Sequence, residues 1–322
     1  MIGGFVLTGV PENIINHVAA QANIRDLTII SNDGGRDNFG LGKLYANGQI
    51  SRHYASYIGK GNAMEQAYLT GETELHLTPQ GTLAEKIRGC GAGIPAFFTA
   101  TGLNTLYAQG KLPVRLNGDG SVAQYNTEHA VSRIGDRDFI FETSFERADF
   151  AWVKASRADK MGNCVFKGTS FNFNGIMASK CYASVCFTLT EAARTVIVEA
   201  EELVEIGDIP PEQVHLPGLY VDRLFVGNSY ERRMDISTAC ATMSPRLPLA
   251  QQAPRSDFDE VRELIARVVA QELVPGTKCN LGVGIPTLAA GYAAEKGVKV
   301  FLQGENGVLG CGPYPARGQE DH

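Results

Sequence analysis

The chain has 322 residues, of which 44% are hydrophobic and 20% charged, so it is long enough to build two domains with buried cores. This composition excludes a disordered or fibrous protein, and because no apolar run reaches about 18 residues, we expect no membrane-spanning helix. The 29 Lys and Arg residues against 35 Asp and Glu residues give a net charge of −6. Since the chain also lacks a run of basic residues, we expect no nucleic-acid partner.

The seven cysteines are odd in number and form no Cys-x-x-Cys pair, so neither a disulfide framework nor a zinc site is expected. This pattern favours a reducing compartment, which would be the cytoplasm or, in a eukaryote, the mitochondrial matrix. Residues 1–11 carry no basic leader and predict a strand and turn, not a signal peptide. We expect no metal, because the histidines have no partner at metal-ligand spacing: His17, His53, His76, His129 and His215.

Apolar runs of strand length alternate with helical stretches over residues 1–236. The predicted strands cover residues 27–30, 74–77, 139–141, 150–153, 186–189 and 195–198. A helix is predicted to begin at Thr82, after Gly81. Strands that are apolar on both sides are typical of a sheet covered by helices on two faces. We therefore expect an α/β fold with mostly parallel sheets.

The composition changes at residues 238–256, where three prolines stand among Ala, Ser and Gln. This stretch is predicted to be a linker between a first domain, residues 1–237, and the start of a second, residues 257–322. The second piece begins with a helix whose apolar positions are Phe258, Val261, Leu264, Ile265, Val268 and Val269. A strand (278–282), a helix (287–295) and a strand (298–302) are predicted to follow. Because so short a piece buries little surface, we expect the second domain to be incomplete.

The two parts share a local plan. Gly3–Pro11 is predicted to open a helix that leads to a strand ending at Ser31–Gly34, and Asn280–Pro286 opens a helix that leads to a strand ending at Gly304–Gly307. Each proline falls in the first helical turn, where its missing N–H removes no hydrogen bond. We interpret this as a duplicated βαβ unit. In the second copy a carboxylate, Glu305, stands at the strand end in place of the amide of Asn32.

Glu305 is the first candidate for chemistry. It follows a predicted strand, at the sheet edge where open α/β folds bind ligands, and glycines surround it at 304, 307, 310 and 312. It can be a nucleophilic carboxylate. The residues themselves leave a second interpretation open, in which Glu305 accepts backbone N–H bonds within a tight turn.

Gln80 and the segment Gly89–Pro95 are weaker candidates. The Gln80 amide, just after the strand at 74–77, can donate a hydrogen bond to a developing oxyanion, although a glutamine in a turn is common without any such role. Gly89–Pro95 is predicted to be a loop after a helix, with backbone N–H groups suited to carboxylate or phosphate. It matches no nucleotide-binding fingerprint.

Seven segments in order along the chain resemble the motifs of the family I coenzyme A transferases. The resemblance covers nearly the whole chain, and the fused order of the two subunits is similar to that of members acting on succinyl-CoA and a 3-oxoacid. The segments are Gly3–Pro11, Thr78–Glu85, residues 91–97, Phe171–Asn174, Glu201–Gly207, Asn280–Pro286 and Leu302–Pro315.

The resemblance implies transfer of coenzyme A between short-chain carboxylic acids, such as succinate and acetoacetate, through a glutamyl-CoA thioester on Glu305. It implies that Gln80 stabilises the oxyanion. It also implies two α/β domains of the CoA-transferase type, a homodimer, acyl-CoA and carboxylic acids as partners, and no cofactor beyond coenzyme A as co-substrate. The expected pocket residues are Asn32, Gly91, Gly93, Asn280, Gly282, Gly284, Asn306 and Gly307.

Three departures accompany the resemblance: Gly304 stands where the family has serine, the chain begins inside the first motif, and most of the second subunit is absent. We therefore expect a chain truncated at both ends, or one that needs a complementing chain. Two further functions stay open. The same glutamate could hydrolyse acyl-CoA, or the chain could bind acyl-CoA without turnover.

Overall fold

The structure is a computed structural model that describes residues 1–178, 180–181, 190–230, 257–282, 285–304 and 309–310. The chain divides into two units, residues 1–233 and 234–322, and each is described by itself. No helix within the described residues is long and apolar enough to cross a membrane.

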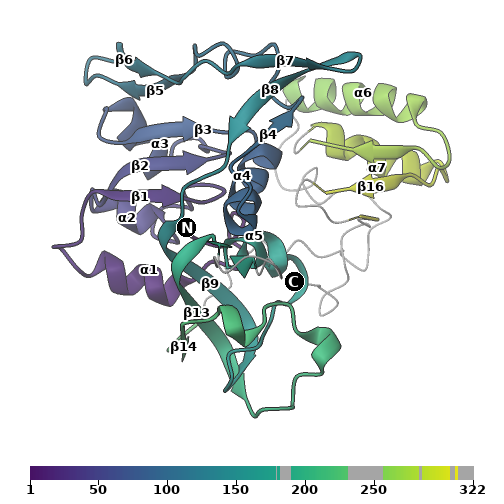
Figure 1. Ribbon diagram of the computed structural model, residues 1–322. Helices are drawn as coiled ribbons and strands as arrows, with labels where there is room; N and C mark the ends of the chain where they lie inside the picture. Colours follow the sequence, from purple (N-terminus) through teal and green to yellow (C-terminus); the bar gives the residue numbers. More distant parts are fainter. Residues whose placement is uncertain (179, 182–189, 231–256, 283–284, 305–308, 311–322) are drawn as a thin grey trace. The chain divides into compact units, whose positions relative to one another are not determined.

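A mostly parallel sheet lies at the centre of the first unit (Figure 1). One part has the order β1-β2-β3, all parallel, and the other the order β10-β9-β13-β14, in which β10 is antiparallel. The strands are β1 (Leu27–Ile30), β2 (Ile50–Ala55), β3 (Glu74–Leu77), β9 (Ala148–Asp159), β10 (Cys164–Val165), β13 (Ala193–Val204) and β14 (Arg223–Val226).

The first three residues join the two parts of the sheet. Ile2 N–H donates to Ile30 O (2.9 Å), and Gly3 N–H donates to Trp152 O (2.8 Å). The bridge between Ile2 and Trp152 is parallel. Residues 1–3 therefore lie between β1 and β9, and the predicted strand before the first helix is confirmed as the centre of the sheet.

Helices cover both faces of this sheet, as predicted. Ile29 and Ile30 are adjacent in β1 and pack into different cores, because successive side chains of a strand point to opposite faces. Ile29 packs with α1–α3 and Ile30 packs with α4 and α5. The helices are α1 (Glu12–Ala19), α2 (Gly42–Ala46), α3 (Ala63–Leu69), α4 (Gln80–Ala92) and α5 (Asn172–Met177).

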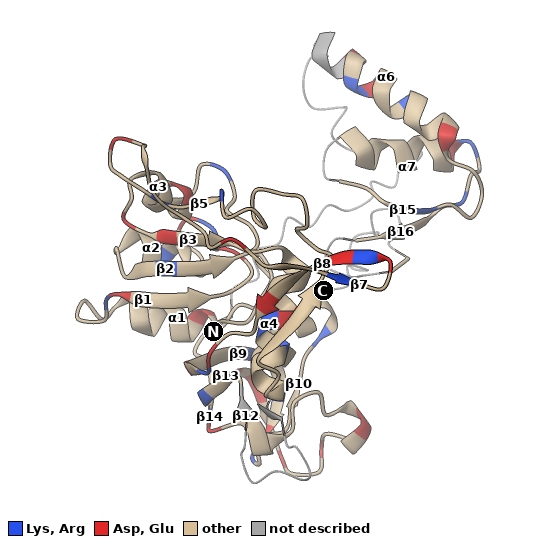
Figure 2. Ribbon diagram, turned by 45° about the horizontal axis from the view of Figure 1, so that its top comes forward, with Lys and Arg blue, Asp and Glu red and all other residues tan. Residues whose placement is uncertain are grey.

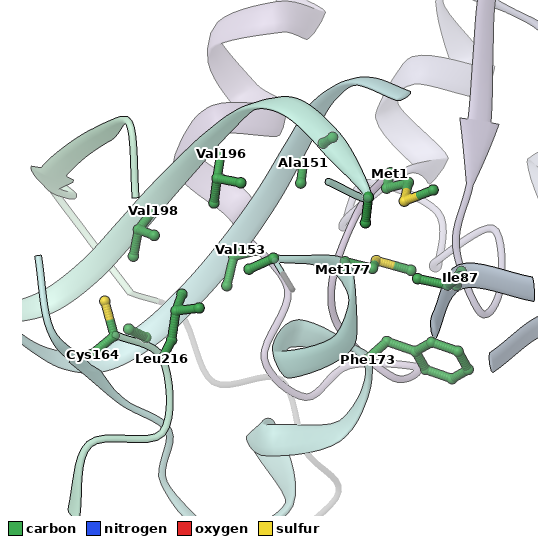
Figure 3. Close-up of a cluster of buried hydrophobic side chains, with 14 of the residues drawn as sticks. Met1, Ile87, Ala151, Val153, Cys164, Phe173, Met177, Val196, Val198 and Leu216 are labelled. Atoms are coloured by element: carbon green, nitrogen blue, oxygen red, sulfur yellow. The ribbon is translucent and has the colours of Figure 1, made fainter. Parts of the chain in front are cut away.

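The larger core lies between β9, β13 and the helices α4 and α5. Val153, Val196 and Val198 are fully buried there, and Figure 3 shows them beside Met177 and Ile87. The predicted strands at 150–153 and 195–198 are thus confirmed as the middle parts of two strands of 12 residues each. Their apolar runs are buried on both faces, which is the arrangement that parallel sheets require.

The rest of the first unit is antiparallel or irregular. The predicted strand at 139–141 is confirmed as part of β8, which pairs antiparallel with its neighbours in the order β4-β8-β7. The predicted strand at 186–189 lies outside the described residues. The remaining elements are β4 (Ala96–Thr99), β5 (Pro113–Leu116), β6 (Val122–Tyr125), β7 (Val131–Ile134), β8 (Arg137–Thr143), β11 (Lys180–Cys181), β12 (Thr190–Glu191), η1 (Gly168–Phe171), η2 (Pro211–Gln213) and η3 (Gly218–Tyr220).

The loop predicted at Gly89–Pro95 is wrong in its first half. Residues 89–92 form the last turn of α4, and Gly93 ends the helix in a left-handed conformation with φ 68°. Ile94 N–H then donates to Gly89 O (2.8 Å), which is a common glycine-terminated helix end. A Cβ at Gly89 would overlap Ser144 Oγ, so close packing, not a loop, explains that glycine.

The second unit contains a βαβ unit, as the duplication predicted. The strands β15 (Lys278–Asn280) and β16 (Phe301–Gln303) are parallel, and α7 (Ile285–Glu295) connects them. The helix α6 (Asp257–Glu272) packs on α7 through the small residues Ala266 and Ala270. The apolar positions expected on its face are instead exposed by 39–62%: Val261, Leu264, Ile265, Val268 and Val269.

Candidate functional site

Three turns leave the carboxyl ends of the parallel strands β1, β2 and β3. Asn32 lies in the first turn, Ser56 in the second and Thr78 in the third. Backbone hydrogen bonds link the turns, because Ser56 N–H donates to Asn32 O (2.9 Å) and Thr78 N–H donates to Ala55 O (2.8 Å). The structure therefore brings the predicted site residue Asn32 to the same sheet edge as the start of α4. Ligands bind at this edge in open α/β sheets.

Gln80 is the first residue of α4 rather than a residue of a turn, so the helix begins two residues before the predicted start at Thr82. Its side chain is exposed, and no described atom lies within 4 Å of where a Cβ on Gly81 would stand. The first turn contains no acidic residue, and the charged residues of α4 come after it (Figure 2). The N–H groups of a first turn have no partner within the helix. The start of α4 can thus donate hydrogen bonds to an oxyanion.

Four buried side-chain atoms among the described residues lack a hydrogen-bond partner, and three of them follow these strands: Asn32 Oδ1, Ser56 Oγ and Thr82 Oγ1. Asn32 is 3% exposed and Thr82 is 2% exposed. Buried polar atoms are nearly always hydrogen-bonded, so three unpaired atoms at one sheet edge indicate a place for a polar ligand.

Sequence reasoning missed Ser56 and Thr82. Serine and threonine are common at strand ends and in first helical turns, where their hydroxyls bond to the backbone. The pattern therefore could not distinguish an unpaired hydroxyl from an ordinary local hydrogen bond. Their position after β2 and β3 was the available signal.

The fourth unpaired atom, His129 Nδ1, belongs to a buried ionic cluster around Glu142. The Glu142 carboxylate is 1% exposed and lies 2.8 Å from Lys86 Nζ and 3.2 Å from His129 Nε2. Tyr107 OH donates to it (2.7 Å), and burial, together with this carboxylate, raises the pKa of Tyr107. Tyr107 also bonds to Thr78, so the cluster anchors the residues that lead into α4. No motif or spacing in the sequence indicated this cluster.

The motifs Gly3–Pro11 and Phe171–Asn174 meet in the structure. Asn174 is fully buried, and its Nδ2 donates to Gly9 O (2.9 Å). A Cβ on Gly3 would lie 2.7 Å from Asn174 Cγ, and one on Gly9 would lie 2.7 Å from Asn174 Nδ2. The two glycines are therefore required because the Asn174 side chain occupies the space where their Cβ atoms would be.

Gly91 and Gly93 lie at the far end of α4 from Gln80. Gly91 is buried in the last turn, and Gly93 is the exposed residue that ends the helix. A helix of 13 residues is about 20 Å long. The structure therefore does not bring these two glycines together with Asn32 and Gln80, and their place in a substrate pocket stays a prediction.

In the second unit, Asn280 pairs with Gln303 at the carboxyl ends of β15 and β16. Asn280 is exposed, and no described atom lies within 4 Å of where a Cβ on Gly282 would stand. Beyond β16, Leu309 bridges antiparallel to Gln303, and Gly310 N–H donates to Leu302 O (2.7 Å). The other predicted site residues lie outside the described residues: Gly284, Glu305, Asn306 and Gly307.

The described part of the chain contains no group of three or more His, Cys, Asp and Glu side chains arranged to hold a metal ion. His53 is fully buried, between Ser31 Oγ (2.7 Å) and Tyr45 OH (2.6 Å), and burial lowers its pKa to about 3. Among the described cysteines, Cys90, Cys164 and Cys279 are free thiols.

This arrangement, an α/β sheet covered on both faces with polar groups gathered at its carboxyl edge, is that of an α/β enzyme domain. The chain belongs to the coenzyme A transferase family, whose model matches residues 1–227 and 262–322. The mitochondrial succinyl-CoA:3-ketoacid coenzyme A transferase 2B of Mus musculus is 40% identical over 322 residues. That match covers 100% of this chain and 58% of the mouse protein, so the chain spans somewhat more than half of its relative.

Two further matches come from a bacterial two-subunit enzyme and from a solved structure. The first of the two subunits of the succinyl-CoA:3-ketoacid coenzyme A transferase of Xanthomonas campestris is 43% identical over 237 residues, which is 74% of this chain and 85% of that subunit. The crystal structure of an acyl-CoA transferase from E. coli O157:H7 in a thioester complex with CoA matches with a TM-score of 0.72 at 19% identity. It covers 96% of this chain and 61% of that chain. The α/β fold with mostly parallel sheets is thus confirmed.

Proposed function

We propose that this chain carries out, or forms part of an enzyme that carries out, transfer of coenzyme A from succinyl-CoA to a 3-oxoacid such as acetoacetate. The names of its relatives in mouse and Xanthomonas support this substrate pair. The observation that carries the proposal is the carboxyl edge of β1–β3. There, three buried polar atoms without partners lie on the turns that surround the start of α4.

The proposed reaction begins with Glu305. Its carboxylate oxygen attacks the carbonyl carbon of the acyl-CoA thioester, and the C–S bond breaks to give a mixed anhydride and CoA thiolate. The thiolate attacks the glutamyl carbonyl of the anhydride, which releases the first acid as a carboxylate and leaves a glutamyl-CoA thioester. The second acid repeats these steps in reverse, so the enzyme alternates between two forms. The thioester energy is conserved in covalent bonds, and we propose no cofactor beyond coenzyme A as co-substrate.

Each carbonyl attack builds negative charge on an oxygen. We propose that the Gln80 amide and the N–H groups at the start of α4 donate hydrogen bonds to that oxygen, since preorganised donors are most effective where charge develops. Asn32, Ser56 and Thr82 are proposed to contact the substrates at the adjacent turns. The remaining pocket assignments are proposals of the same kind: Gly91, Gly93, Asn280, Gly282, Gly284, Asn306 and Gly307.

We also propose that the active enzyme is a homodimer located in the cytoplasm or, in a eukaryote, in the mitochondrial matrix. The mouse relative is named as mitochondrial, and the three free thiols among the described residues suit a reducing compartment. Light scattering during size-exclusion chromatography tests the dimer, and a monomer at micromolar concentration would contradict it.

The proposed function is tested by mixing the chain with acyl-CoA in the absence of an acceptor acid and measuring its intact mass. We expect a CoA-sized adduct that is lost in Glu305→Gln and kept in Glu295→Gln, a matched control in α7 of the same unit. An adduct that persists in Glu305→Gln would place the nucleophile elsewhere.

Product analysis separates the alternatives. CoA exchange that depends on an added acid supports transfer, whereas thiol release without an acid would show hydrolysis. If neither occurs, the chain binds acyl-CoA without turnover and the proposal is wrong.

A further inference from the structure

The turn in the Gly3–Pro11 motif contains a strained residue. Val6 has φ 54°, in the left-handed region, which a β-branched residue rarely adopts. Phe5 and Thr8 close the turn with two backbone hydrogen bonds of 2.9 and 3.0 Å. A strained conformation of this kind persists where the surrounding structure holds it, and such residues gather at functional sites.

Asp33 is the side chain that holds this residue. Its Oδ2 accepts the Val6 N–H (2.8 Å), and its Oδ1 accepts the Gly35 N–H (2.7 Å). The ends of the turn are held separately, because Asn172 Nδ2 donates to Thr8 O (3.1 Å). Asp33 therefore connects the middle of the turn to the carboxyl end of β1.

The same carboxylate sets the orientation of Asn32. Asn32 Nδ2 donates to Asp33 Oδ2 (3.1 Å), and an ionised carboxylate can only accept, so the amide must present its nitrogen to Asp33. The oxygen on the other side of that amide, Asn32 Oδ1, is buried and has no partner among the described residues. Asn32 thus offers an acceptor, which calls for an N–H or O–H donor on the ligand.

The chemistry of the substrates decides which of them can supply that donor. A carboxylate and a thioester carbonyl have acceptors only, whereas the pantetheine arm of coenzyme A carries two amide N–H groups and a hydroxyl. An acceptor at the sheet edge therefore fits the CoA half of the substrate and not the acid.

We propose that Asp33 is a positioning residue, which holds Val6 in its left-handed conformation and turns the Asn32 oxygen toward the pantetheine arm of coenzyme A. This inference rests on the proposed function and adds a substrate contact to it. Asp33 acts through its neighbours and does not itself touch the reacting atoms.

The test uses Asp33→Ala, Val6→Gly and the double variant, with Asp37→Ala as the matched control. Asp37 lies in the same connection and accepts the Ala63 N–H (3.1 Å), but it does not contact the Val6 turn. The readout is the acyl-CoA concentration that gives half-maximal glutamyl-CoA adduct. The acceptor acid concentration that discharges half of the adduct, and the thermal unfolding midpoint, are measured beside it.

Asp33→Ala is expected to raise the half-maximal acyl-CoA concentration about tenfold, because two oriented hydrogen bonds are lost, and to change the acid dependence less than twofold. Val6→Gly in the Asp33→Ala background should recover about threefold of that loss relative to Val6→Gly alone, since glycine adopts a positive φ without strain. Asp37→Ala should leave both dependences within twofold of the unmodified chain.

An Asp33→Ala variant with unchanged acyl-CoA dependence overturns the inference, even if it melts at a lower temperature. An equal loss in acyl-CoA and acid dependence also overturns it. If Asp33→Ala does not fold, Asp33→Asn replaces it, because the amide keeps one acceptor oxygen and the shape of the side chain. Absence of any adduct in the unmodified chain refutes the proposed function instead, and the coupling of Asp33 to Val6 is then measured from unfolding midpoints.

Discussion

A methyl group added at Gly3 tests the junction at the centre of the first unit. In Gly3→Ala the new Cβ would lie 2.7 Å from Asn174 Cγ and 3.2 Å from Asn174 Cα, and it would overlap Asn174 Oδ1. The Asn174 side chain is fully buried, so it has no solvent into which to turn. The variant can be accommodated when the asparagine gives up its hydrogen bonds or when the strand segment moves.

The hydrogen bonds of Asn174 set the size of the effect. Lys154 N–H donates to its Oδ1 (3.0 Å), and its Nδ2 donates to Gly9 O (2.9 Å) and to Ser170 O (2.8 Å). Each contributes about 1 kcal/mol net, so their loss should reduce the free energy of unfolding by roughly 3 kcal/mol. The backbone conformation adds nothing to this figure, because Gly3 does not have a positive φ.

Urea unfolding followed by tryptophan fluorescence measures this effect directly. The chain has one tryptophan, Trp152, and its carbonyl accepts the Gly3 N–H (2.8 Å), so the probe lies at the substituted position. Gly81→Ala is the matched control. Its Cβ would meet no described atom within 4 Å, and alanine in a helix should raise the free energy of unfolding by up to about 1 kcal/mol.

A double variant shows whether the clash itself is responsible. With Asn174→Ala already present, the methyl group at residue 3 has room, so Gly3→Ala should then reduce stability far less than it does alone. A loss below about 1 kcal/mol in Gly3→Ala, or additive losses in the double variant, would refute this account of the two motifs.

Three further predictions concern buried polar groups of the first unit. Because burial lowers the pKa of His53 to about 3, the unfolded state takes up a proton below pH 6.5 that the folded state does not. The free energy of unfolding should therefore fall by roughly 2 kcal/mol between about pH 6.5 and 5, and His53→Gln should lack this part of the slope in urea titrations. Glu142→Ala strands the Lys86 ammonium without its partner at 2.8 Å and should lose about 3 kcal/mol or more. Glu142→Gln, which keeps an acceptor, should lose less, and equal losses would contradict the role of the cluster. Thr82→Val removes an unpaired buried hydroxyl, so stability should stay constant or rise by about 1 kcal/mol while the half-maximal acyl-CoA concentration for adduct formation rises about fivefold. Marked destabilisation without a change in acyl-CoA dependence would indicate a structural role for Thr82.

Local pattern was enough to predict much of the fold. The strands at 27–30 and 74–77 have the predicted bounds, and the βαβ unit across α7 has the predicted order. Apolar runs, helix-starting prolines and glycine-containing turns are properties of consecutive residues, so these elements are visible without tertiary contacts. The position of Asn32 after the first of these strands, and of Glu305 after the last, follows from the same kind of pattern.

Tertiary packing decided what consecutive residues could not indicate. Three glycines near residue 90 suggest a loop, yet α4 continues to Ala92 because its last turn is buried, with Gly89 against Ser144. The helix α6 has an apolar face by its spacing, yet its small residues make the contact with α7.

The polar groups of the first unit make the same point most clearly. Glu142 has its partners at residues 86, 107 and 129, and the Asp33 carboxylate reaches back to the N–H of Val6. The sequence determined which strand ends carry polar residues. Only the folded chain determined which of those residues are paired and which are left unpaired, because a hydrogen bond depends on the distance between atoms and not on their separation along the chain.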